Sequence, residues 1–140
     1  MNAWVGFDLD GTIALYDGWK GIEHIGEPNL EWIHYVKELL NLGVDVRIVT
    51  ARVQEGPEAI AFVQDWTQQH LGQRLVVTDR KDMNMVALVD DRAYGPKSWH
   101  QVPFAWEFAA MTKWHNHPNN PNSPASVAQA DGDSGQSNES

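Results

Sequence analysis

The chain has 140 residues, with 19 acidic and 10 basic side chains and a formal net charge of -9. This length favours one domain with a sizeable core. The lack of cysteine excludes disulfide bonds and thiolate chemistry. The acidic balance argues against nonspecific binding to duplex nucleic acid, which needs clustered lysine and arginine.

The hydrophobic pattern contains no candidate membrane segment, because no apolar run approaches the roughly 18 residues of a spanning helix. A strand-like apolar run begins near the first residue, so we expect no signal peptide. Both observations fit a cytoplasmic protein that does not contact a membrane, and we expect that location.

Apolar spacing predicts alternating strands and helices along most of the chain. The predicted strands are 3–7, 44–49, 74–78 and 85–89, and the predicted helices are 28–41, 57–71 and 104–114. Residues 13–27 are rich in glycine and predict a loop. Strands that alternate with helices indicate an α/β fold with a mostly parallel sheet and helices on both faces, which makes three layers.

The composition changes at about residue 116, where Pro, Asn, Ser and Gly replace large apolar side chains. Such a segment does not bury enough apolar surface to offset the entropy lost on ordering. We therefore predict a core domain at 1–115 and a disordered tail at 116–140.

Polar residues follow the predicted strands at the ends where an open α/β sheet binds its ligands. These residues are Asp8 and Asp10, Thr50 and Arg52, Arg80 and Lys81, and Asp90 and Asp91. Four neighbouring carboxylates repel one another and raise one another's pKa. Mg²⁺ relieves this repulsion, because it prefers oxygen ligands and is commonly held by one or two carboxylates with phosphate oxygens.

The same residues divide the work of phosphoryl transfer. A carboxylate can attack phosphorus and form an aspartyl-phosphate. A second carboxylate two residues further on the strand points to the same side and can act as general acid and base. A hydroxyl and a lysine can hold the phosphoryl oxygens, and Gly11 lets the chain leave the strand sharply.

Four short motifs carry a resemblance to a known superfamily. The segment "DLDGT" at 8–12 resembles the first motif of the haloacid dehalogenase-like (HAD) hydrolases. "RIVTAR" (47–52), "DRKD" (79–82) and "LVDDRA" (88–93) resemble the second, third and fourth motifs, in the same order. The resemblance covers about residues 3–95 and implies a Rossmann-like core with Mg²⁺-dependent phosphatase activity on phosphoric monoesters.

The resemblance also implies roles for individual residues. Asp8 would be the nucleophile, Asp10 the general acid and base, and Thr50 and Lys81 the ligands of the phosphoryl group. The Mg²⁺ ligands would be Asp8, Asp10 through its backbone carbonyl, and Asp90, with Asp91 close by. Further substrate-binding candidates are Gly11, Thr12, Trp19, Arg52 and Arg80.

The spacing leaves no room for the large cap domain that many HAD proteins carry over the site. The segments "TAR" (50–52) and "DDRA" (90–93) are similar to those of capless enzymes such as the phosphatase half of polynucleotide kinase-phosphatase, and to small phage-type HAD proteins. An open site favours a large phosphorylated substrate or closure by a partner chain, and we expect a nucleotide or nucleic-acid-end phosphate. Trp19 either stacks on a base or packs its loop onto the domain.

Several alternatives remain open from the sequence. Only six residues separate Thr78 from Met85, whereas a parallel crossover usually needs a dozen or more. Either the strand at 74–78 is shorter or differently placed, or a single helical turn makes the crossing. This makes Arg80 a rival to Lys81.

Further expectations concern individual side chains and the function itself. Arg52 either binds substrate or pairs with an acidic neighbour, and Asp91 is either a metal neighbour or a turn cap. Helical spacing predicts core positions for four tryptophans, namely Trp32, Trp66, Trp106 and Trp114. The alternative function is a non-catalytic phosphate-binding or regulatory module on the same fold.

Overall fold

The computed structural model describes residues 3–95 and 101–121. The chain divides into two compact units, one of Met1–Tyr16 with Gly21–Ala93 and one of Asp17–Lys20 with Tyr94–Ser140. Each unit is described by itself. Among the described residues, no helix has the length and apolar character needed to cross a membrane.

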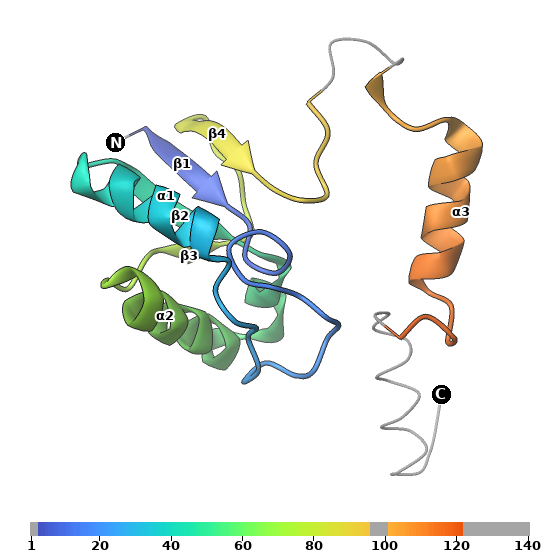
Figure 1. The fold of residues 1–140 in the computed structure, drawn as a ribbon, viewed down its shortest axis with the longest axis horizontal. Coiled ribbons are helices and arrows are strands. Elements are labelled where there is room, and N and C mark those ends of the chain that lie inside the picture. The colour runs from blue at the N-terminus through green and yellow to red at the C-terminus, as the bar shows by residue number, and fades with distance from the viewer. Residues whose placement is uncertain (1–2, 96–100, 122–140) are drawn as a thin grey trace. The chain divides into compact units, whose positions relative to one another are not determined.

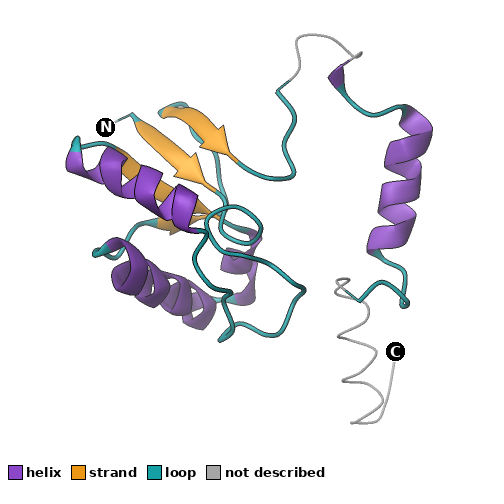
Figure 2. Cartoon of the chain, viewed as in Figure 1, coloured by secondary structure: helices purple, strands orange, loops and turns teal. Residues whose placement is uncertain are grey.

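The first unit is an α/β structure built on a four-stranded sheet of order β3-β2-β1-β4 (Figures 1 and 2). Its elements are β1 (Trp4–Phe7), α1 (Leu30–Asn41), β2 (Asp45–Val49), the 3-10 helix η1 (Ala51–Glu55), α2 (Pro57–Leu71), β3 (Val77–Thr78) and β4 (Met85–Val89). Every strand pair is parallel. The α/β class, the Rossmann-like parallel sheet and the lack of a large cap among the described residues are confirmed.

One face of the sheet forms the core together with α1 and α2. Phe7 of β1 is fully buried and its ring lies 5.9 Å from that of Trp32, which is half-buried on α1. Val46 and Ile48 alternate inward on β2, as the period of a strand requires. Trp66 of α2 belongs to the same cluster, so the core positions predicted for Trp32 and Trp66 are confirmed.

The opposite face of the sheet carries Trp4, because side chains three positions apart on a strand point to opposite sides. The Trp4 indole is fully buried beneath the Arg47 guanidinium, which lies 4.7 Å from the ring centroid. The indole Nε1 donates a hydrogen bond of 2.9 Å to Asp82 Oδ1, and this bond holds the pKa of Asp82 below its ordinary value. The remaining described helix, α3 (Ala105–His115), belongs to the second unit. The predicted layer of helix on the Trp4 face of the sheet therefore stays a prediction.

The connection from β3 to β4 contains no helix. Strand β3 has only two residues, and residues 79–84 cross to the far edge of the sheet as irregular chain that ends in a turn. The shorter strand was the first of the two alternatives, and it is the correct one. The Trp4 N–H donates to the Asn84 carbonyl at 2.9 Å, so the turn at the end of this connection lies at the amino end of β1.

The second unit contains α3 (Ala105–His115), which matches the helix predicted at 104–114. The core positions predicted for Trp106 and Trp114 are wrong, because these side chains are 70% and 52% exposed. The apolar residues of α3 are spread around the helix and form no single stripe that one core could cover. Residues 122–140 of the predicted tail lie outside the described part of the chain.

Candidate active site

Three acidic residues lie together at the carboxyl ends of the neighbouring strands β1 and β4. Phe7 pairs with Val89 in the parallel register of β1 and β4, so Asp8 and Asp90 leave the sheet side by side. The Asp8 N–H donates to the Val89 carbonyl at 2.9 Å and extends the pairing by one step. Asp8, Asp90 and Asp91 each offer a carboxylate oxygen, and these three oxygens lie within 4.8 Å of one another.

A tight loop after β1 holds this cluster in place. The chain reverses at Gly11, whose φ of 86° is a left-handed conformation that glycine adopts at little cost. The Ala14 N–H donates to the Leu9 carbonyl at 2.9 Å, and both side chains are fully buried. Thr12 Oγ1 accepts a bond of 3.1 Å from the Asp91 N–H. The predicted substrate ligands Gly11 and Thr12 therefore join the loop to the end of β4.

The three acidic groups of the cluster, Asp8, Asp90 and Asp91, bring like charges close together. Burial raises the pKa of Asp8 to about 8, and the hydrogen bond to Asp91 and the charges of Asp90 and Asp91 act in the same direction. Neighbouring carboxylate oxygens of this kind are the donor set that a hard divalent cation suits. The three side chains therefore fit Mg²⁺, and its binding would favour the ionised form of Asp8.

Asp90 also directs the chain away from the sheet. Its Oδ1 accepts a 2.8 Å bond from the Arg92 N–H, and its carbonyl accepts a 3.3 Å bond from the Ala93 N–H. Of the two acidic neighbours, Asp90 therefore caps this turn, whereas the side chain of Asp91 bonds to Asp8. The side chain of Asp91 therefore lies in the carboxylate cluster, and its role beside a metal stays a prediction.

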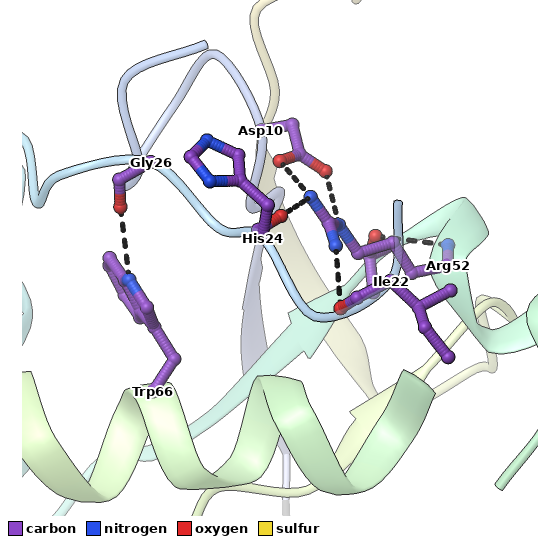
Figure 3. A network of polar contacts seen from close by, with 7 residues as sticks. Asp10, Ile22, His24, Gly26, Arg52 and Trp66 are labelled. Carbon is purple, nitrogen blue, oxygen red and sulfur yellow. Dashed lines mark hydrogen bonds and ion pairs between the residues drawn. The ribbon is translucent and has the colours of Figure 1, made fainter. Parts of the chain in front are cut away.

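Asp10 lies in a separate contact with Arg52 (Figure 3). Arg52 Nε donates to Asp10 Oδ2 at 2.8 Å and Nη2 donates to Oδ1 at 2.9 Å. The guanidinium also donates to the backbone carbonyls of Ile22 and His24, at 3.4 Å and 3.0 Å. Of the two roles considered for Arg52, the structure has the pairing with an acidic neighbour. The two carbonyls were missed from the sequence, since backbone acceptors leave no mark in residue type.

Thr50 lies where β2 turns into η1. It is 5% exposed, and its Oγ1 accepts a bond of 3.2 Å from the Arg52 N–H as the cap of η1. Its own N–H donates to the Thr78 carbonyl at 2.9 Å and so extends the β2–β3 pairing. Thr50 is therefore held at the carboxyl end of its strand, as predicted from the motif.

The two basic residues after β3 lie in different places. The Arg80 N–H donates to Thr78 Oγ1 at 3.1 Å, which keeps its backbone at the carboxyl end of β3. Lys81 precedes Asp82, whose side chain is bonded to Trp4 at the opposite end of β1. Trp4 and Asp8 are about 13 Å apart along the strand at about 3.3 Å per residue. Among the described residues, no hydrogen bond or ion pair joins Lys81 to the three carboxylates.

Trp19 belongs to the second unit and is half-buried. Its neighbour Lys20 forms an exposed ion pair of 2.8 Å with Asp17. Because the two units are described separately, the predicted stacking of Trp19 on a base stays a prediction.

Comparison with known proteins supports the fold class. No protein-family profile matches the chain, and no curated protein is significantly similar to it. A solved structure from Bacteroides thetaiotaomicron, described as a conserved protein coded by locus, matches with a TM-score of 0.51. The match covers 81% of this chain and 91% of the other at 16% sequence identity, which shows a shared fold and no more. The chain is thus an α/β protein with an all-parallel sheet and an acidic cluster after β1 and β4.

Proposed function

We propose that this protein is a Mg²⁺-dependent phosphomonoesterase of the HAD type. The observation that carries the proposal is the group of three carboxylate oxygens within 4.8 Å at the carboxyl ends of β1 and β4. The motif "DLDGT" contributes Asp8 to this group and the motif "LVDDRA" contributes Asp90 and Asp91. Two motifs distant in sequence therefore supply one cluster, as a common metal and phosphate site requires.

The metal would be held by Asp8, Asp90 and the Asp10 carbonyl, with Asp91 beside them. When bound, the cation would neutralise the carboxylates and the charge that develops on the phosphoryl oxygens. The protein supplies the remaining groups. Thr50 and Arg80 stand at the same edge of the sheet and are suited to hold phosphoryl oxygens.

The reaction proceeds in two balanced steps. An Asp8 oxygen forms a bond to phosphorus while the bond from phosphorus to the ester oxygen breaks, and Asp10 gives its proton to that oxygen. The alcohol leaves and an aspartyl-phosphate remains. Ionised Asp10 then takes a proton from water as the water oxygen bonds to phosphorus. The bond from Asp8 to phosphorus breaks, phosphate is released, and Asp8 is regenerated as a carboxylate.

Two features bear on the substrate class, namely the described elements, which include no large cap, and the charge of the chain. The described residues contain no large cap, which supports an open site that admits a bulky ester. A net charge of -9 disfavours a long nucleic-acid footprint. We therefore propose a mononucleotide or the phosphorylated end of a short nucleic acid as the substrate.

The test is hydrolysis of a panel of phosphate esters with and without Mg²⁺. The panel holds an aryl phosphate, nucleoside 3′- and 5′-phosphates, and short oligonucleotides phosphorylated at either end. We expect Mg²⁺-dependent phosphate release that Asp8→Asn abolishes. Asp65→Asn is the matched control, because Asp65 is an exposed carboxylate that pairs with Arg74 on the surface.

Two outcomes would contradict the proposal. Hydrolysis that continues at the same rate in Asp8→Asn would exclude Asp8 as the nucleophile. Saturable Mg²⁺ binding without release of phosphate from any ester would favour the alternative, a phosphate-binding or regulatory module. Isothermal titration with inorganic phosphate in the presence of Mg²⁺ would then measure that binding directly.

A further inference from the structure

Arg52 makes more polar contacts with other segments than a surface arginine does. Its side chain is 5% exposed, and it pairs with Asp10 through two parallel hydrogen bonds. The same guanidinium donates hydrogen bonds to the backbone carbonyls of Ile22 and His24. We propose that Arg52 is the positioning residue for Asp10, holding the general acid and the segment 22–24 in one fixed arrangement. This inference rests on the proposed phosphatase function.

The geometry disfavours direct binding of substrate by Arg52. Its three guanidinium nitrogens donate to Asp10, Ile22 and His24, and burial leaves little of the group exposed to a ligand. Its backbone N–H donates a hydrogen bond to Thr50 Oγ1 at the start of η1, and this bond fixes the backbone from which the side chain extends. Hydrogen bonds thus hold both the backbone and the guanidinium of Arg52. Such a side chain is suited to orient a neighbouring carboxylate and is poorly suited to follow a phosphoryl group that moves during the reaction.

Asp10 keeps the capacity to carry a proton while Arg52 holds it. A carboxylate has about four lone-pair sites, and the two hydrogen bonds from Arg52 occupy one site on each oxygen. The remaining sites can hold the proton that passes to the ester oxygen. Two parallel bonds also fix the plane of the carboxylate, which one point charge would not do.

The burial of the Arg52–Asp10 ion pair is weak evidence that the pair serves only to stabilise the fold. Apolar side chains of similar volume often replace such pairs without loss of stability. The pair here joins the proposed acid and base to the start of η1 and to the segment 22–24, so its geometry bears on proton transfer.

The test separates acid positioning from general damage by varying the leaving group. Protonation of the ester oxygen matters for an alkyl phosphate, whose alkoxide leaves poorly, and matters little for p-nitrophenyl phosphate. Single-turnover formation of the aspartyl-phosphate is measured with both esters in saturating Mg²⁺. The variants are Arg52→Lys, which keeps the charge but not the two parallel bonds, and Arg52→Gln. The control is Arg74→Lys, at the exposed ion pair with Asp65.

We expect Arg52→Lys to lose about 10-fold and Arg52→Gln about 100-fold with the alkyl ester. With p-nitrophenyl phosphate, both should lose less than about 3-fold, and Asp10→Asn should show the same selectivity. Arg74→Lys should match the wild type with both esters. Thermal melts identify a variant that fails to fold, and Arg52→Lys, the milder change, then decides the question.

Three results would overturn the positioning role. An equal loss with both esters would show a merely structural arginine. If the rate of aspartyl-phosphate formation reaches its half-maximum at a higher ester concentration with an unchanged maximal rate, for both esters, Arg52 binds substrate directly. In these two cases the wild-type protein still hydrolyses esters, so the proposed function stands. A wild-type protein that forms no aspartyl-phosphate with either ester contradicts the proposed function itself, and the positioning role is lost with it.

Discussion

The carboxylate of Asp91 lies directly against Gly11. A Cβ atom added to Gly11 would clash with Asp91 Oδ2, because it would stand closer than Cβ atoms approach other heavy atoms. Gly11 also has a φ of 86°. The glycine of the "DLDGT" motif therefore serves two purposes, since it makes the turn and leaves room for a carboxylate of the cluster.

Gly11→Ala should lower both stability and Mg²⁺ affinity. The left-handed backbone alone costs an alanine about 1–2 kcal/mol, and the clash adds displacement of Asp91. Gly43→Ala is the matched control, because Gly43 has a φ of 82° and nothing lies within 4 Å of an added Cβ. Chemical denaturation should show a loss in both variants, whereas Mg²⁺ titration should show weaker binding in Gly11→Ala alone. Equal Mg²⁺ affinity in the two variants would contradict this account.

Asp8→Asn should be more stable than the wild type at pH 8 when no divalent cation is present. The raised pKa of about 8 means that folded Asp8 keeps its proton between pH 3.8, its ordinary pKa, and pH 8, while the unfolded chain loses it. The folded state binds more protons in this window, so its stability falls as pH rises. After allowance for solvent screening, we expect about 2 kcal/mol at pH 8.

The difference between Asp8→Asn and the wild type should become small toward pH 4, because the unfolded side chain also begins to bind a proton near its ordinary pKa of 3.8. Thermal melts from pH 4 to pH 9 in EDTA measure this dependence. Parallel curves for the two proteins across that range would show that Asp8 has an ordinary pKa.

Mg²⁺ should stabilise the wild type and have little effect on Asp8→Asn. A ligand that binds only the folded state at 100 times its Kd adds about 2.7 kcal/mol. The effect should grow from pH 6 to pH 8, because the cation binds the ionised carboxylates. Differential scanning fluorimetry in MgCl₂, with NaCl at equal ionic strength as the control, measures the shift in Tm. The same shift in Asp8→Asn would place the bound cation elsewhere.

Arg80→Ala should weaken substrate binding more than Lys81→Ala does. The backbone of Arg80 is held at the carboxyl end of β3, whereas Lys81 is followed by Asp82, which bonds to Trp4. Loss of one hydrogen bond to a charged phosphoryl group corresponds to about 10-fold or more in kcat/KM. Steady-state kinetics on the best ester of the panel compare the two variants. A larger loss of kcat/KM in Lys81→Ala would contradict this prediction and would favour Lys81, the residue expected from the third motif.

The sequence by itself determined the elements and the ends of the strands. An apolar run without alternation indicated β1, and spacing of three and four residues indicated α1 and α2. Asp8 and Asp90 could be assigned to strand ends because each directly follows such a run. These features depend on local periodicity, which a single segment contains in full. Parallel strands then bring their carboxyl ends to one edge, so the meeting of Asp8 with Asp90 and Asp91 followed from the fold class.

Only the tertiary structure decided the contacts between segments that no periodic pattern relates. The bond from Arg52 to Asp10 joins residues 42 positions apart, and residue type alone left Arg52 with two roles. The placement of Lys81 depended on how six residues cross the sheet, and the bond from Trp4 to Asp82 fixes that path. Likewise, the exposure of Trp106 and Trp114 depends on which surface packs against α3. Long-range packing and hydrogen bonds decide these features, and the local sequence does not contain them.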